Sequence, residues 1–115
     1  MTAMHRIESL AESPAGTPVH DELCARIAQL DRDFRALSIG ELGRRVDAIR
    51  KIARTHGLEP VSRLAAGLGD MLARGGRGPS VRPYLDGLRD AAGCPQQDEA
   101  TARAFMAAVH LRLVG

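Results

Sequence analysis

The sequence has few aromatic residues, a single lysine and only two cysteines. Aromatic side chains make up 3% of its 115 residues, and tryptophan is absent altogether. Because β-sheets usually recruit aromatic and β-branched side chains, this scarcity argues against a β fold. Alanine and leucine dominate the apolar residues instead, and both enter helices at little cost. The composition therefore predicts an all-α protein.

Long hydrophobic runs are lacking too. No uninterrupted apolar stretch comes near the roughly 18 residues that span a bilayer, and residues 1–16 lack the apolar centre of a secretory signal. We therefore expect a cytoplasmic protein that does not bind membranes. With 44% hydrophobic and 26% charged residues, the chain has the balance of a globular protein and the length of one domain.

Neither the charge nor the cysteines indicate a nucleic-acid or metal site. Lysine and arginine total 16 against 14 acidic residues, and the resulting formal net charge of +2 is too small to indicate nucleic acid. Cys24 and Cys94 have no metal-ligand spacing and no CxxC motif, so we expect a buried or partly buried free thiol at each. We expect no metal and no cofactor.

Apolar periodicity divides residues 17–115 into five helices joined by short loops. Apolar residues recur three and four positions apart, as on a helix face that packs against a core. Short loops favour antiparallel neighbours. We therefore expect an antiparallel up-and-down four-helix bundle with an additional C-terminal helix, preceded by a flexible tail at residues 1–16. The helices are expected to begin near Thr17, Ile39, Pro60, Ser80 and Asp98.

Local signals sharpen the ends of the first two helices. The apolar stripe of the first helix extends to Phe34 and Leu37. Ser38 and Glu41 form a capping box at the start of the second helix, in which each side chain satisfies a free amide of the other residue. Gly57 follows the last turn of that helix and is expected to take the left-handed conformation. Ile39 begins the inward stripe of the second helix.

The third and fifth helices carry signals about packing. Gly67 and Gly69 each weaken the third helix by ~1 kcal/mol relative to alanine, so we expect them to permit close helix packing. The stripe of the fifth helix is expected to run inward as far as Leu113.

A polar face accompanies the buried stripe of the second helix. At 100° per residue, Gly43, Asp47, Arg50 and Arg54 form one strip, with Lys51 further round. A small residue, a carboxylate and three cations thus share one surface. Such a surface is either an ordinary solvated face or a docking site, and the charge pattern alone favours the solvated face.

Residues 47–58, DAIRKIARTHGL, resemble the central hairpin of histidine-containing phosphotransfer (HPt) domains. In that family a helix presents an exposed histidine, then a basic residue three positions on and a small residue after it. A glycine ten positions after the histidine ends the helix. Here Arg50 falls on the basic position, Ala53 on a small packing position and Gly57 on the helix-ending glycine. The apolar pattern of the next helix matches at Leu58, Val61, Leu64 and Leu68.

Two departures from the family decide what the resemblance implies. Asp47 stands where the family has its phosphorylated histidine, and Lys51 stands where a small residue is usual. A carboxylate lacks the imidazole nitrogen that accepts the phosphoryl group. The resemblance therefore implies a non-catalytic module of two-component signalling. It would bind a receiver or histidine-kinase domain through Gly43, Asp47, Arg50, Lys51 and Arg54 without carrying phosphate.

Two alternatives to this function stay open. The chain is either a free-standing helical structural or dimerisation protein with no signalling role, or a true phosphocarrier that uses another histidine. A homodimer is compatible with the helical periodicity. The four histidines are scattered and form no nucleophile–base pair with a neighbour in sequence, so we do not expect an enzyme.

Overall fold

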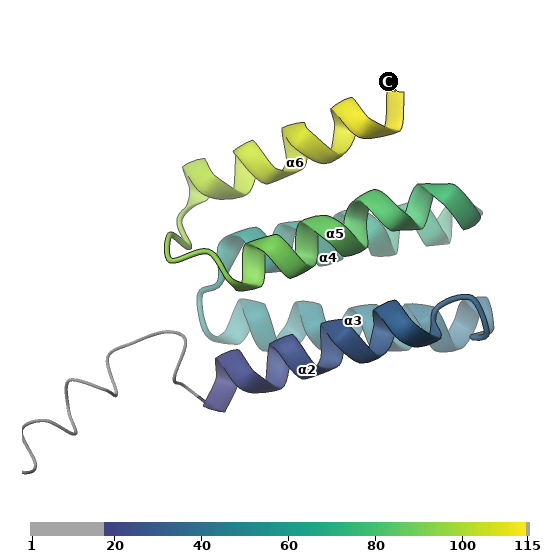
Figure 1. Ribbon diagram of the computed structural model, residues 1–115, viewed down its shortest axis with the longest axis horizontal. Helices are drawn as coiled ribbons and strands as arrows, with labels where there is room; N and C mark the ends of the chain where they lie inside the picture. Colours follow the sequence, from purple (N-terminus) through teal and green to yellow (C-terminus); the bar gives the residue numbers. More distant parts are fainter. Residues whose placement is uncertain (1–17, 115) are drawn as a thin grey trace, which may run out of the picture.

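The computed structural model describes residues 18–114, and within this range all regular structure is helical (Figure 1). The α-helices are α2 (Pro18–Asp33), α3 (Ile39–Thr55), α4 (Glu59–Ala73), α5 (Val81–Ala92) and α6 (Glu99–Val114), and the 3₁₀-helix η2 (Gly78–Ser80) leads into α5. The all-α prediction is confirmed for these residues. The expected tail at residues 1–16, and Thr17 as the start of the first helix, lie outside the described residues.

Helix α4 makes the most extensive contacts with the other helices. It packs most extensively against α3, and also against α5 and α6. Helix α2 contacts both α3 and α5, which closes a ring of contacts through α2, α3, α4 and α5. Helix α6 packs on α4 and α5 and lies along one edge of the molecule (Figure 1). One face of each ring helix therefore meets a shared core, whereas α6 is covered from one side.

Leucine, isoleucine, valine and alanine side chains fill that core. In the described part of the chain, no polar or charged side chain is buried. The largest completely buried side chains come from all four ring helices: Leu23, Leu30, Leu42, Ile49, Leu64, Leu68, Leu85 and Leu88. Burial of apolar area is therefore the main source of stability in the ring.

The first helix is shorter than its apolar stripe predicts. Helix α2 ends at Asp33, so Phe34 and Leu37 lie in the link to α3 and not on the helix. Phe34 remains buried and Leu37 is partly buried, because the link folds back over the core. The guanidinium of Arg77 donates a 2.6 Å hydrogen bond to the carbonyl oxygen of Leu37 and ties this link to the segment before α5.

Half of the expected capping box is present at the start of α3. The Ser38 Oγ accepts a 3.1 Å hydrogen bond from the backbone N–H of Glu41, as predicted. The Glu41 carboxylate, however, pairs with Arg44 at 2.7 Å and with Arg45 at 3.3 Å. The inward placement of Ile39 is wrong, since its side chain is 47% exposed. The first buried residue of the stripe is Leu42, one turn further along α3.

Gly57 ends α3 in the way the sequence predicts. Its φ of 69° is in the left-handed region. The Gly57 N–H donates to the carbonyl oxygen of Arg54 at 3.3 Å, and the Leu58 N–H donates to that of Ala53 at 2.9 Å. This pair of bonds is the Schellman pattern, which satisfies the last carbonyl groups of a helix. Leu58 packs against the core, and α4 begins at the next residue.

The two glycines of α4 have different roles. A Cβ at Gly67 would lie 3.0 Å from Tyr84 Cε1 and 3.1 Å from Met106 Cε, so this glycine permits close packing against α5 and α6, as predicted. A Cβ at Gly69 would meet only Val46 Cγ1, at 3.9 Å. That is an ordinary contact distance, and the expectation of close packing at Gly69 is wrong.

Helix α6 is the least buried helix of the described chain. Only Ala102 and Val109 among its residues are buried. A Cβ at Gly87 of α5 would lie 3.2 Å from Val109 Cγ2 of α6. The absence of a side chain at Gly87 therefore permits close packing between α5 and α6, as Gly67 does between α4 and α6. The inward placement of Leu113 is wrong, since α6 has neighbours on one side only and this side chain is 39% exposed. No helix within residues 18–114 is long and apolar enough to cross a membrane.

Both cysteines are free thiols. Cys94 is partly buried, as expected, but Cys24 is exposed, because it lies at an open hollow between α2 and α5 that Ile27 and Ala92 also line. The His20 Nε2 lies 3.5 Å from its Sγ.

Candidate functional site

A hollow of about 400 Å³ lies between α3 and α4. Half of the residues that line it are glycine or alanine, so the two helices leave space where larger side chains would fill it. A Cβ added at Gly43 would meet nothing within 4 Å, which shows that the α3 wall is open at this point. The lining residues are Gly43, Val46, Asp47 and Arg50 from α3, with Ala65, Ala66, Gly69 and Asp70 from α4.

Asp47 is the carboxylate at the α3 wall of the hollow, and its side chain is 43% exposed. Arg50 donates to its Oδ1 at 2.7 Å from Nη2, and the Lys51 Nζ lies 3.1 Å from its Oδ2. Hydrogen bonds from Arg50 and then Lys51 hold the pKa of the Asp47 carboxyl below its ordinary value. Asp47 is therefore ionised at neutral pH, and both of its oxygens are occupied by cations of its own helix.

The structure brings together most of the face predicted on α3, but not all of it. Gly43, Asp47 and Arg50 line the hollow. Lys51 is exposed and joins the group through its ion pair with Asp47. Arg54 is exposed one turn further along α3 and does not line the hollow. The predicted face thus consists of Asp47 with its two paired cations at the edge of the hollow, and of Arg54 outside the hollow.

Sequence reasoning missed the wall that α4 contributes. Ala65, Ala66, Gly69 and Asp70 line this side, and Asp70 adds a second, exposed carboxylate. The available signal was the group of small residues Ala65, Ala66, Gly67 and Gly69. The sequence analysis predicts only close helix packing at the two glycines, whereas the missing side chain at Gly69 leaves open space.

A second hollow, of about 290 Å³, lies where α2 begins and α3 ends. Its walls are mainly apolar, and His20, His56, Cys94 and Gln97 add polar groups. His56, the histidine nearest the predicted site in sequence, is the exposed C-cap residue of α3 and borders this second hollow. Among residues 18–114 no three metal-ligating side chains gather into a cluster.

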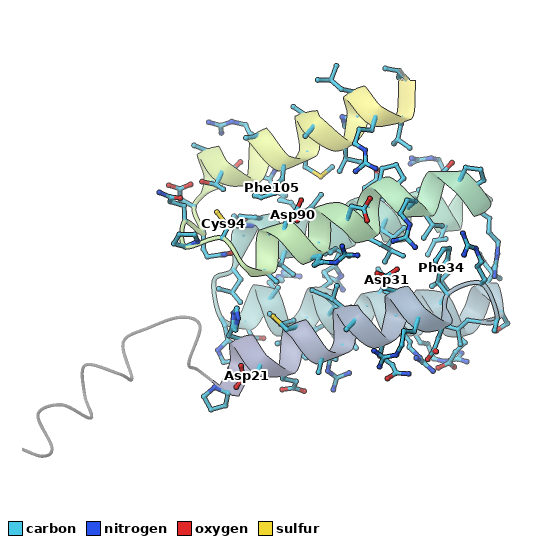
Figure 2. The ribbon with its side chains drawn as sticks, viewed as in Figure 1. Asp21, Asp31, Phe34, Asp90, Cys94 and Phe105 are labelled. Atoms are coloured by element: carbon cyan, nitrogen blue, oxygen red, sulfur yellow. The ribbon has the colours of Figure 1, made fainter. Side chains whose placement is uncertain are left out.

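A network of ion pairs joins α2, α5 and α6, and none of its residues lines either of these two hollows. Asp31 pairs with Arg82 at 2.8 Å and with Arg89 at 2.7 Å, and Asp86 pairs with Arg112 at 3.0 Å. Figure 2 shows Asp31 between α2 and α5. Burial disfavours the Asp31 carboxylate, but the hydrogen bonds from Arg82 and Arg89 outweigh it and lower the pKa of Asp31. This network joins helices to one another, whereas the α3–α4 hollow is the one lined by the residues predicted on α3.

Searches of known protein families, of curated proteins and of solved structures found no match to this chain. The likeness to HPt domains therefore stays a prediction from the motif in residues 47–58. The geometry of the α3–α4 hollow does not depend on this likeness.

Proposed function

We propose that this protein is an HPt-like interaction module of bacterial two-component signalling that binds a receiver or histidine-kinase domain without carrying phosphate. One observation carries the proposal. Asp47, at the position that corresponds to the phosphorylated histidine, stands half exposed at the wall of a hollow bordered by small residues. A partner surface can approach Asp47 and its two paired cations from the side of the hollow, because the residues that border it there are mostly small.

The proposed scaffold is an antiparallel up-and-down bundle formed by α2, α3, α4 and α5, with α6 as an additional helix. The closed ring of contacts through these four helices supports this topology, as do the short links between them. The proposed location is the cytoplasm, where two-component partners would meet it.

Electrostatics favour binding over transfer at this site. Asp47 offers no imidazole nitrogen, and its charge is balanced by Arg50 and Lys51. With Arg54 beyond them and Asp70 across the hollow, three cations stand against two carboxylates at this face. Receiver domains resemble one another in having an acidic phosphorylation pocket, which such a face complements. Charges at the rim of an interface act mainly on association rate and salt dependence.

Association rates measured over a salt series test the proposal. The double variant Arg50→Glu/Arg54→Glu should bind receiver domains of the same organism more slowly than the wild type, and its salt dependence should reverse in sign. The matched control is Arg26→Glu/Arg103→Glu, which changes the net charge equally on α2 and α6. It should bind like the wild type apart from a small general charge effect.

Two results would overturn this proposal. If the wild type binds none of the receivers and kinases, or if both double variants bind alike, the face is a solvated surface. The free-standing structural or dimerisation protein is then the better interpretation.

A phosphotransfer assay gives a second, independent arm. Wild-type protein should take no acid-labile label from a phosphorylated receiver. The variant Asp47→His/Lys51→Ala should gain it, since the phosphoryl group passes from the receiver's aspartyl phosphate to the new imidazole nitrogen. Wild-type labelling that disappears in His56→Gln or His110→Gln would establish the phosphocarrier alternative instead.

A further inference from the structure

The last turn of α6 carries most of the exposed large apolar side chains of the described chain. Of the four such side chains in residues 18–114, three lie in the last four residues of this helix. Leu111 is 69% exposed and Val114 is 82% exposed. The remaining one, Ile39, lies at the start of α3. Exposed apolar side chains that gather on one element mark a contact surface, whereas single ones are ordinary.

Leu111 and Val114 belong to a regular row along the outward face of α6, whereas Leu113 lies on the opposite side of the helix. Counting back from Val114, apolar residues recur at intervals of three, four, three and four, and all of them are exposed. This is the spacing of the contact positions of a two-helix coiled coil. The row consists of Ala100, Ala104, Ala107, Leu111 and Val114, and we call it the outer row.

The charged residues of α6 are engaged within the chain and leave the outer row uncharged. Glu99 pairs with Arg63 of α4, and Arg103 pairs with Glu99. Arg112 reaches Asp86 of α5 at 3.0 Å. A partner for the outer row therefore needs an apolar helical surface and no compensating charge.

The order of side-chain sizes identifies that partner. The outer row is small at its N-terminal end and large at its C-terminal end. When two copies of the row run antiparallel about a two-fold axis near Ala107, Ala104 faces Leu111 of the second copy and Ala100 faces its Val114. Large side chains then meet small ones at both ends, which is the self-complementary arrangement that a two-fold interface requires. Parallel copies would set alanine against alanine and leave a gap.

We propose that a second copy of this chain covers the outer row, by antiparallel pairing of two α6 helices. The interface would be about 24 Å long, since a 16-residue helix rises about 1.5 Å per residue. One helix per chain gives an interface at the small end of specific contacts. The dimer is therefore weak, with a dissociation constant in the range of roughly 10–100 µM. The α3–α4 hollow contains no α6 residue, so this proposal does not depend on the proposed signalling function.

Sedimentation equilibrium of the full chain from about 1 µM to 1 mM tests the dimer. The wild type should pass from monomer to dimer in this range, and Leu111→Glu should raise the dissociation constant roughly a hundredfold, because it puts an unpaired charge into the contact. The matched control is Ile39→Glu, which changes the exposed apolar side chain of α3 and should leave the dimer intact. Circular dichroism checks that each variant keeps its helices.

Cross-linking tests the antiparallel direction. In a background with Cys24→Ser and Cys94→Ser, chains carrying Ala100→Cys are mixed with chains carrying Val114→Cys and oxidised. Disulfides should join unlike chains far more than like ones, since their Cα atoms must lie within about 7 Å. A wild type that stays monomeric at 1 mM, a dimer that survives Leu111→Glu, or disulfides mainly between like chains would each overturn the proposal.

Discussion

Helices α4 and α6 are similar in length and are both rich in apolar residues, yet the protein uses them differently. Helix α4 has neighbours on three sides, and seven of its residues are buried. Helix α6 has α4 and α5 on one side only, and two of its residues are buried. The number of neighbouring helices, and not apolar content, therefore decides how much of a helix is buried.

The two helices also differ in how they are attached. Helix α4 is held by interlocking leucine side chains inside the ring. Helix α6 is held by close contacts at Gly67 and Gly87, and by ion pairs near its two ends, Arg63 with Glu99 and Arg112 with Asp86. Exposed ion pairs contribute little stability, so α6 should be the more easily detached helix.

The largest effect should come from truncating the same side chain in each helix. Leu64→Ala in α4 leaves a cavity in the ring and should lower the free energy of unfolding by about 2–5 kcal/mol. Leu111→Ala in α6 should change it by no more than about 0.5 kcal/mol when measured on dilute, monomeric protein. Urea unfolding followed by circular dichroism makes the comparison. Equal losses would mean that the outer row of α6 is packed against the protein.

A medium effect should come from adding a methyl group where α6 rests on α4. Gly67→Ala places a Cβ against Tyr84 and Met106, and should cost about 1 kcal/mol through overpacking. Gly43→Ala adds the same methyl group in open space and should gain about 0.5–1 kcal/mol. Amide hydrogen exchange should show faster exchange in α6 than in α4 for Gly67→Ala. If both variants stabilise the protein alike, the contact at Gly67 is loose.

The smallest effect should come from an ion pair of α6. Arg112→Gln breaks the pair with Asp86 and should cost about 0.5 kcal/mol at low salt. The cost should vanish at about 1 M salt, where the Debye length falls to about 3 Å. Arg26→Gln, which breaks the pair with Glu22 inside α2, is the control and should not alter exchange in α6. A cost that persists at high salt would show that Arg112 acts through packing.

Features set by neighbours in sequence could be predicted. The left-handed Gly57 and the Ser38 cap depend on local backbone geometry, and the side chains around Asp47 share a face because helix periodicity places them there. Ile39 and Leu113 were placed wrongly because each lies at an end of its stripe. At those ends burial depends on whether another helix extends as far, and periodicity carries no such information.

The hollow itself could not be predicted for a related reason. Its α3 wall follows from the spacing of Gly43, Asp47 and Arg50. Its α4 wall depends on the position of α4 along α3, which places Gly69 beside Val46. The packing of all four ring helices sets the position of α4 along α3. From the sequence alone, the absence of a side chain at Gly69 could equally have indicated close helix packing.

The ion pair between Lys51 and Asp47 has a practical consequence. Lys51 is the only lysine of the chain, and its Nζ lies 3.1 Å from the carboxylate at the wall of the hollow. Reagents that acylate amines have Lys51 as their single side-chain target on this chain, beside its N-terminal amine. A photoreactive group attached to Lys51 would stand beside the proposed docking face and form covalent bonds with whatever binds it. Chemical capture in cell extracts can thus begin from the native chain, without an engineered cysteine.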